Sequence, residues 1–195
     1  MCEQISQQTK RLVKQPDDQV YIDKVKQGDS ASFAFLVDRY KHMAYTIALR
    51  IMRNAEDAED AAQEGFVKAY QQLHRFEGKS KFSTWLYTIV YRVAITKLEQ
   101  QRVATVPIQE ELTETYSNSY QTNQLESLQV SDQQKYIKDA IERLPATEGL
   151  LITLYYLDEK SIREIEEITG LSESNIKVKL FRARKVLEEQ LRFLL

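Results

Sequence analysis

Apolar residues recur every three or four positions along much of the first hundred residues, which is the spacing of amphipathic helices. One long helix is predicted by a stripe of seven residues: Phe33, Leu36, Val37, Tyr40, Ala44, Ile47 and Ile51. Asn54 is a suitable N-cap for a second helix, whose inward face would consist of Ala58, Ala62, Phe66, Ala69 and Leu73. After the break RFEGKSKFS, a third helix is predicted over about residues 84–102, with Leu86, Ile89, Val90 and Val93 inward.

Shorter helices are predicted from about residue 132 onward. A stripe of Ile137, Ile141 and Leu144 stops at Pro145, and the apolar run TEGLLITLYYL that follows is expected to be largely buried. The sequence SIRE, residues 161–164, is a capping box that would begin a short helix ending at Gly170. Ser172 would cap a last helix, with an inward face of Ile176, Leu180, Ala183 and Leu187. Two capped helices joined by a turn of about three residues predict a helix-turn-helix.

Residues 103–131 separate these two helical parts. The segment carries four acids and no base, contains one proline and has weak apolar periodicity. A structureless loop of this length is unusual inside one compact domain. The sequence therefore predicts an all-α protein with two small domains, residues 1–102 and residues 132–195, joined by a flexible linker of residues 103–131.

Composition excludes several functional classes. The chain has 195 residues, and its 5 glycines are all isolated, so it contains no glycine-rich phosphate loop. Its 2 histidines and 1 cysteine exclude a Cys/His zinc site and a disulfide framework. No stretch is long enough to span a bilayer, and the first residues lack the apolar core of a signal peptide. We therefore expect a cytoplasmic protein that does not insert into a membrane and holds no metal or other cofactor.

The formal net charge of −2 conceals a strongly uneven distribution. Residues 68–102 and 172–186 are basic, whereas residues 56–64 hold five acids and no base. Two basic segments and an acidic one predict separate binding surfaces on a nearly neutral protein.

The second helix of the predicted helix-turn-helix carries a cationic and polar face. We expect DNA contacts from Ser174, Asn175, Lys177, Val178, Lys179, Phe181, Arg182 and Lys185. Lys and Arg bind phosphates, while Arg, Asn and methyl groups read base edges, so such a face suits a major groove. Lys177, Val178, Phe181 and Arg182 would enter the groove, and Lys179 and Lys185 would bind phosphates. The alternative is a plain helical hairpin with a solvated basic face.

A second candidate surface joins a lysine-bearing loop to a helix rich in aromatic residues. Its members are Lys79, Lys81, Thr84, Thr88, Tyr91 and Arg92. Aromatic rings stack on unpaired bases while cations hold the backbone, so this combination is typical of single-stranded nucleic acid binding. The alternative is that most of the aromatic residues, Phe82 and Trp85 above all, belong to the core.

Acidic residues at helical spacing form a third candidate surface. Glu56, Asp60 and Glu64 are four residues apart, and Gln63 lies beside them. No histidine and no second acidic cluster accompanies these carboxylates, so an enzyme is not expected. The competing interpretations are a solvated helix face and a surface that docks another protein.

Three blocks of the sequence, in order and at the right spacing, resemble the extracytoplasmic-function (ECF) sigma factors of bacterial RNA polymerase. They are KVKQGDSASFAFLVDRY, NAEDAEDAAQEGFVKAYQQLHRFEGKSKFSTWLYTIVYRVA and AIERLPATEGLLITLYYLDEKSIREIEEITGLSESNIKVKLFRARKVLEEQL. The resemblance covers about residues 20–102 and 132–192. It departs from the family pattern at Arg92, where an asparagine is common, at Val178, where a small polar residue is frequent, and at the end KLEQQR, where several arginines are usual. These departures concern the promoter sequence and not the class.

The resemblance implies a role for each surface. The first domain would bind the clamp coiled coil of core RNA polymerase through Glu56, Asp60, Gln63 and Glu64. It would also melt and read the −10 promoter element through Lys79, Lys81, Thr84, Thr88, Tyr91 and Arg92. The second domain would bind the polymerase flap and read the −35 element, with Arg184 facing the flap or the domain itself. An anti-sigma factor is a further expected partner, and no small-molecule substrate is expected.

Two other functions remain open at this point. A helix-turn-helix regulator that never joins RNA polymerase would use the same last helix, but it would not require the aromatic block of residues 66–102. A helical adaptor protein would account for the acidic face but not for the two basic segments.

Overall fold

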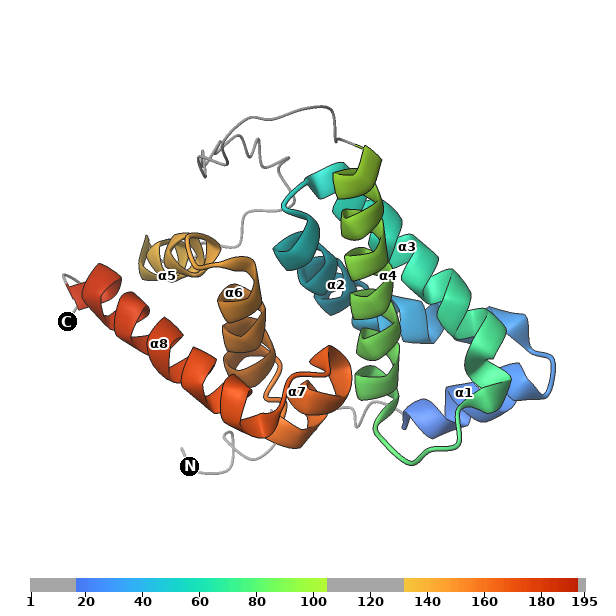
Figure 1. The fold of residues 1–195 in the computed structure, drawn as a ribbon. Helices are drawn as coiled ribbons and strands as arrows, with labels where there is room; N and C mark the ends of the chain where they lie inside the picture. The colour runs from blue at the N-terminus through green and yellow to red at the C-terminus, as the bar shows by residue number, and fades with distance from the viewer. Residues whose placement is uncertain (1–16, 105–131, 193–195) are drawn as a thin grey trace, which may run out of the picture.

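The computed structural model describes residues 17–104 and 132–192, and within these ranges every regular element is a helix (Figure 1). This confirms the all-α prediction. Residues 105–131, most of the predicted linker, lie outside the described residues, so its flexibility stays a prediction. The described part of α4 ends at residue 104, two residues beyond the expected boundary of the first domain.

The first unit is built around three long helices that pack side by side (Figure 1). Its elements are α1 (Asp18–Lys26), η1 (Ser30–Ser32), α2 (Phe33–Met52), α3 (Ala55–Gln72), η2 (Leu73–Arg75) and α4 (Phe82–Ala104). Asn54 caps α3 as predicted, because its Oδ1 accepts a hydrogen bond from the Asp57 amide at 3.1 Å. Gly65 of α3 is buried against Val90 of α4, where a side chain would have little room.

The second unit contains the predicted helix-turn-helix. Its elements are α5 (Asp132–Glu142), α6 (Ala146–Ile152), η3 (Thr153–Leu157, a π-helix), α7 (Ile162–Thr169) and α8 (Glu173–Leu191). Both halves of the Ser161–Glu164 capping box are formed, and Gly170 ends α7 with a φ of 72°. Ser172 stands at the N-cap of α8 but its hydroxyl makes no capping hydrogen bond; it lies 3.3 Å from the Ser174 hydroxyl instead.

The apolar run before the helix-turn-helix is buried in its middle and exposed at its end. Residues 149–154 are buried, whereas Tyr155, Tyr156 and Leu157 are exposed at the end of the π-helix. The prediction that the run is largely buried therefore holds for residues 149–154 and is wrong for its last three residues. Ile137 is likewise exposed, while Ile141 and Leu144 of the same stripe are buried. An unbroken apolar run carries no periodicity, so it cannot show which side of its helix meets the core.

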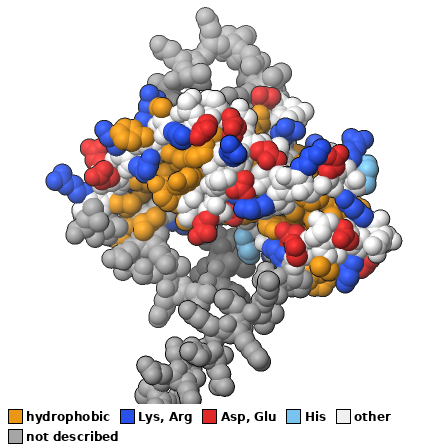
Figure 2. Space-filling model, turned by 90° about the horizontal axis from the view of Figure 1, so that it is seen from below, with side chains coloured by type: hydrophobic (Ala, Val, Ile, Leu, Met, Phe, Trp, Pro, Cys, Tyr) orange, Lys and Arg blue, Asp and Glu red, His pale blue; other side chains and the backbone are white. Residues whose placement is uncertain are grey.

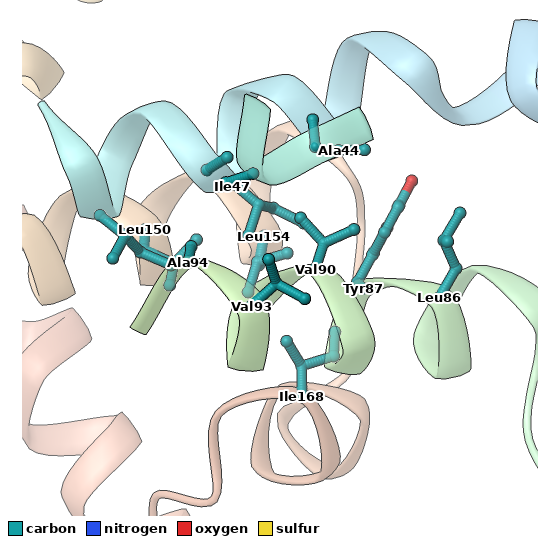
Figure 3. Packing of buried hydrophobic residues seen from close by; sticks show 14 of the residues in the cluster. Ala44, Ile47, Leu86, Tyr87, Val90, Val93, Ala94, Leu150, Leu154 and Ile168 are labelled. Atoms are coloured by element: carbon teal, nitrogen blue, oxygen red, sulfur yellow. The ribbon is translucent and has the colours of Figure 1, made fainter. Parts of the chain in front are cut away.

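The two units pack against each other and share one apolar cluster. In this arrangement α7 lies against α4, and α6 lies against α2 (Figure 1). Figure 3 shows Ile168 pointing from α7 toward α4, and the cluster also includes Ile47, Val93, Leu150 and Leu154. Each of these side chains is buried. The side of α4 that faces the second unit is therefore covered by α7.

Candidate nucleic-acid and polymerase surfaces

The polar side of α8 is exposed because its opposite side anchors the helix. Ile176, Leu180 and Ala183 are buried against the rest of the second unit. The outward residues form what we call the α8 face: Ser174, Asn175, Lys177, Val178, Phe181, Arg182 and Lys185. Val178 and Phe181 are 47% and 53% exposed, so their apolar groups are available to contact a partner. The structure therefore presents all seven residues on the surface of the helix-turn-helix.

Lys179 lies apart from the α8 face. Its Nζ donates a hydrogen bond to Glu148 Oε1 of α6 at 2.9 Å, and both side chains are largely buried. The Lys179 ammonium, which the sequence predicts to bind a DNA phosphate, is thus paired with a carboxylate of the same protein. Lys177 also has an acidic neighbour, Glu173 at 2.6 Å, but this pair is exposed, so water screens it and it holds Lys177 weakly.

The second candidate surface is divided in the structure. We call its predicted residues together the α4 face: Lys79, Lys81, Thr84, Thr88, Tyr91 and Arg92. Arg92 is exposed, Tyr91 is half-buried, and Lys79 is exposed beside Glu77. Thr84 is completely buried and Thr88 partly so, because α7 lies over them. The structure does not gather these six residues into one accessible surface.

The aromatic residues next to the α4 face belong mostly to the core. Phe82 is 3% exposed, and its ring lies 5.7 Å from the rings of both Phe76 and Trp85. Tyr87 is also buried, and desolvation raises the pKa of its hydroxyl. The interpretation of Phe82 and Trp85 as core residues therefore fits their packing, and among the predicted stacking residues Tyr91 remains partly accessible.

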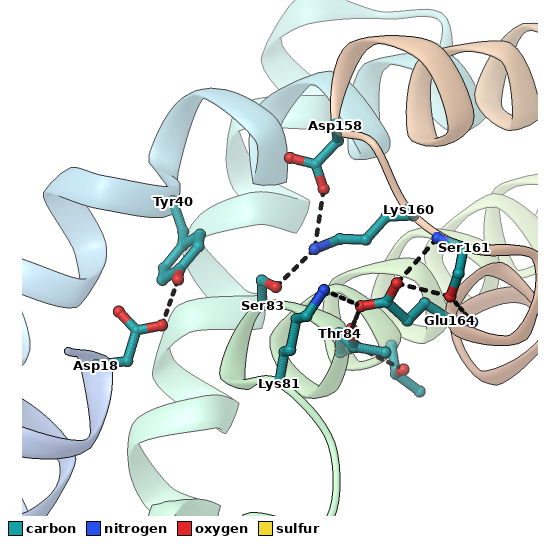
Figure 4. A network of polar contacts seen from close by, with 10 residues as sticks. Asp18, Tyr40, Lys81, Ser83, Thr84, Asp158, Lys160, Ser161 and Glu164 are labelled. Atoms are coloured by element: carbon teal, nitrogen blue, oxygen red, sulfur yellow. Dashed lines mark hydrogen bonds and ion pairs between the residues drawn. The ribbon is translucent and has the colours of Figure 1, made fainter.

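A polar network joins α7 to the start of α4 (Figure 4). Glu164 Oε1 accepts hydrogen bonds from Lys81 Nζ at 3.0 Å and from the Thr84 hydroxyl at 3.3 Å. Its other oxygen, Oε2, accepts the Ser161 amide at 2.9 Å and completes the capping box. Burial alone would raise the pKa of Glu164, but the hydrogen bonds from Ser161 and the Lys81 ammonium lower this pKa to about 2. Glu164 is therefore ionised at neutral pH. Its hydrogen bonds connect α7 of the second unit to Lys81 and Thr84 of the first unit.

A buried lysine lies beside this network. Lys160 Nζ donates a hydrogen bond to the Ser83 hydroxyl at 2.7 Å and lies 3.2 Å from Asp158 Oδ2. The Lys160 side chain is 7% exposed, and its ammonium lies 5.3 Å from the centre of the Tyr87 ring. Burial raises the pKa of Asp158, although the attraction of Lys160 opposes that shift. Sequence reasoning missed Ser83 and Lys160 and assigned Glu164 a capping role alone, because nothing in the pattern of one segment shows which distant segment it meets.

The acidic residues of α3 form the third surface. Glu56, Asp60 and Gln63 are exposed, as the sequence predicts for an outward helix face. Glu64 differs because its two oxygens accept Lys68 at 2.7 Å and Lys97 of α4 at 3.1 Å. These hydrogen bonds lower the pKa of Glu64 below its usual value. We call these four residues the α3 face; its free negative charge comes from Glu56 and Asp60.

The described ranges contain no group of three or more His, Cys, Asp or Glu side chains placed to hold a metal ion. Among residues 17–104 and 132–192, none of the helices combines the length and apolar character that a membrane span requires.

Comparison with known protein families matches both units. The Sigma-70 region 2 family matches residues 36–103, and the Sigma-70 region 4 family matches residues 134–187. These two regions, in this order, define a sigma factor. The ECF RNA polymerase sigma factor SigW of Bacillus subtilis (strain 168) is 37% identical over 181 residues, which cover 88% of this chain and 95% of SigW. The ECF RNA polymerase sigma-E factor of Haemophilus influenzae is 32% identical over 188 residues, covering 92% and 98%.

The chain belongs to the ECF RNA polymerase sigma factors. It binds RNA polymerase and directs promoter-specific initiation of transcription. The alternative of a helix-turn-helix regulator that never joins polymerase is wrong. The chain matches the Sigma-70 region 2 family as well as region 4, and its similarity to SigW covers 95% of that protein.

A solved structure shares the fold. The sigma factor RpoE in complex with the anti-sigma factor NepR from Bartonella quintana superposes with a TM-score of 0.59 at 23% identity, covering 82% of this chain and 96% of that chain. The two-unit helical architecture is thus that of a known sigma factor.

Proposed function

We propose that this sigma factor divides promoter recognition between its two helical units, residues 1–102 and 132–195. The second unit reads the −35 element with the α8 face, and the first unit melts and reads the −10 element with the α4 face. The observation that carries the proposal is the α8 face. Its seven side chains are all exposed on the second helix of a fully formed helix-turn-helix, and they combine cationic and polar groups with two apolar ones.

Within the α8 face, position along the helix separates two roles. Ser174 and Asn175 stand in the first turn, and Lys177, Val178, Phe181 and Arg182 follow on the same exposed side. These residues enter the major groove, where Arg and Lys take purine acceptors and apolar groups contact thymine methyls. Lys185 lies further along the helix, with its ammonium 4.9 Å from the Phe181 ring centre, and it binds a phosphate. Lys179 reaches a phosphate after it leaves Glu148.

Within the α4 face, two sets of residues act at different times. Arg92, Lys79 and Lys81 are exposed and Tyr91 is half-buried, so these residues can meet DNA first, with Lys81 leaving Glu164. Thr84 and Thr88 contact the single strand once α7 has moved. A base taken out of the stack costs a few kcal/mol, and stacking and hydrogen bonds in its pocket offset this cost.

The α3 face docks the clamp coiled coil of core RNA polymerase. Glu56 and Asp60 are exposed and can meet basic residues, whereas Glu64 must exchange Lys68 or Lys97 for a partner on the polymerase. Gln63 is exposed too, and its side-chain amide donates a hydrogen bond to Glu59 Oε1 at 3.2 Å. The flap of the polymerase binds the second unit. The sigma factor performs no chemistry and needs no cofactor, since the polymerase carries out the reaction.

An anti-sigma factor is the proposed regulatory partner, and the cytoplasm, where RNA polymerase and promoter DNA are found, is the proposed location. The solved RpoE of Bartonella quintana was captured with an anti-sigma factor, and we propose a partner of the same class for this chain.

Transcription in vitro tests the division of roles. Core polymerase is supplied with sheared genomic DNA, with and without the protein, and new start sites are mapped. Arg182→Ala should lose start sites or shift their −35 sequence, whereas Arg92→Ala should retain promoter binding and lose strand opening, detected by permanganate at thymines. Glu166→Gln, at an exposed position outside the three faces, is the control. Normal permanganate reactivity in Arg92→Ala would refute the −10 assignment.

A further inference from the structure

We propose that helix α1 holds the loop between η2 and α4 in the shape that the melted DNA strand needs, and that Lys26 of α1 is the positioning residue. We call residues 77–81 the η2–α4 loop. The inference rests on the proposed −10 role of Lys79 and Lys81, which belong to this loop. Lys26 acts through the backbone of the loop and does not itself contact DNA.

The loop begins at a backbone carbonyl that Lys26 binds. The Lys26 ammonium donates a hydrogen bond to the backbone oxygen of Phe76 at 2.6 Å and lies 5.9 Å from the centre of the Phe76 ring. Phe76 follows η2, which lies against α1 (Figure 1), and its ψ of 112° is that of extended backbone. The direction of this carbonyl depends on ψ, so a charged donor from another helix fixes the angle at which the loop starts.

The loop ends at Phe82, which α1 holds through α2. The ring of Tyr40 on α2 lies 5.6 Å from the ring of Phe82, and the Tyr40 hydroxyl donates a hydrogen bond to Asp18 Oδ2 of α1 (Figure 4). Burial raises the pKa of the Tyr40 hydroxyl, so this group remains a donor at neutral pH. Arg39 pairs with the other oxygen of Asp18. Both ends of the loop are therefore connected to α1.

The two ends of the loop also contact each other. The rings of Phe76 and Phe82 lie 5.7 Å apart in an edge-to-face arrangement, and the ring of Trp85 lies 5.2 Å and 5.7 Å from them. Between these ends Gly78 has a φ of 72°, a conformation that glycine adopts without strain. The loop thus leaves and re-enters the same aromatic cluster, and α1 fixes that cluster from outside.

The shape of the loop matters because its charges are partly compensated. Lys79 pairs with Glu77 in the same loop, and Lys81 pairs with Glu164. Seen from below Figure 1, the side on which the loop lies, acidic and basic side chains of the described residues are interspersed (Figure 2). Charge alone therefore attracts a strand weakly here, and the donors must stand where its phosphates pass. A loop that is already ordered loses less conformational freedom when the strand binds.

Three substitutions in the full chain separate positioning from a direct DNA contact. Lys26→Met removes the ammonium and keeps an unbranched side chain. Lys26→Arg keeps a charged donor that can bind the same carbonyl. Lys24→Met makes the same change of charge at another exposed position of α1, and it is the matched control.

Two measurements on the free protein report on the loop without DNA. Trp85 is the one tryptophan of the sequence, so quenching of its fluorescence by acrylamide reports on the aromatic cluster. Trypsin cleavage after Lys79 and Lys81 reports on the loop itself. Lys26→Met should increase the quenching and raise the cleavage rate about threefold to tenfold, as expected when a partly exposed hydrogen bond to a charged group is lost. Lys26→Arg and Lys24→Met should match the wild type. Equal quenching and cleavage in Lys26→Met and the wild type would overturn the proposed contact.

Promoter opening by the holoenzyme measures the consequence for function, on a promoter found by the start-site mapping. Lys26→Met should keep promoter binding and its salt dependence, and should lower the fraction of open complexes about threefold to tenfold, detected by permanganate at thymines. Lys26→Arg should restore opening. Loss of a direct phosphate contact would instead lower the salt slope by about one. A lower slope together with an unchanged loop would show that Lys26 binds DNA and would overturn the positioning role.

The double variant Lys79→Ala, Lys81→Ala distinguishes the two proposals. If it stops opening while Lys26→Met loosens the loop and opens promoters normally, the −10 role of the loop stands and positioning by Lys26 is wrong. If the double variant opens promoters normally, the loop is not a −10 surface, and the functional part of this inference is wrong as well. The contact of α1 with the loop is then decided by Trp85 quenching and trypsin cleavage alone.

Discussion

Gly65 of α3 lies directly against Val90 of α4, so Gly65→Ala should push these two helices apart. A Cβ atom at position 65 would lie 2.7 Å from Val90 Cγ2 and 3.3 Å from Val90 Cα. Valine is stiff at χ1 and its Cα is backbone, so neither atom can turn aside. Overpacking of this kind costs about 1–3 kcal/mol, while alanine in place of glycine gains about 1 kcal/mol of helix propensity. We expect a net loss of about 1 kcal/mol in the free energy of unfolding.

Urea unfolding followed by circular dichroism measures this change, and the Val90→Ala background supplies the control. Val90→Ala removes the severe overlap at 2.7 Å and leaves the tighter-than-usual contact with Cα at 3.3 Å, which a shift of a few tenths of an ångström relieves. In that background Gly65→Ala should therefore stabilise the protein, by at most about 1 kcal/mol from helix propensity. The two effects of Gly65→Ala should thus have opposite signs. If Gly65→Ala stabilises the wild type as much as it stabilises Val90→Ala, the helices are not in the close contact described.

Three further predictions concern binding and pH. Asp60→Lys should weaken binding to core RNA polymerase, mainly through a slower and more salt-dependent association, with an unchanged melting temperature; equal association kinetics would contradict docking by the α3 face. Arg182→Ala should cost about 1–3 kcal/mol and relax specificity at one −35 position, while Lys185→Ala should weaken all sequences alike and lower the salt slope by about one. Holoenzyme binding to a −35 library at two salt concentrations checks this pair, and uniform losses in both would refute the assignment. The pKa of Glu164 is lowered from 4.5 to about 2, so its stabilising contribution is complete above about pH 5 and declines as the pH falls toward that pKa. The melting temperature of Glu164→Gln should therefore fall less than that of the wild type between pH 6 and pH 3, and parallel curves would contradict the contribution.

Local signals in the sequence predicted the helices and their ends well. Asn54 caps α3, the Ser161–Glu164 capping box begins α7, and Gly170 ends α7 in a left-handed conformation. Each of these depends on residues within three or four positions of one another, so the chain around them contains the whole cause. The apolar stripes likewise identified inward positions such as Val90 and Leu180.

The contact between the two units could not be predicted in the same way. Thr84 stands on a polar stripe, which predicts exposure, yet it is buried because α7 covers it. Lys160 is a charged residue between two helices, where a solvated side chain is the ordinary expectation, yet it reaches Ser83 across the interface. Periodicity shows which side of a helix avoids water, but it does not show that a polar side will meet another polar side far along the chain.

Thr84 and Glu164 are 80 positions apart in the sequence. Because α7 is synthesised after α4, it can cover α4 only after a delay during synthesis. A ribosome adding about 5–20 residues per second needs roughly 4–16 s to pass from one to the other. Helices α1 to α4 pack mainly with one another, so the first unit can fold on the ribosome within that interval. For those seconds the nascent chain would display Ser83, Thr84 and Thr88 uncovered, and α7 would close over them as the last part of the protein emerges.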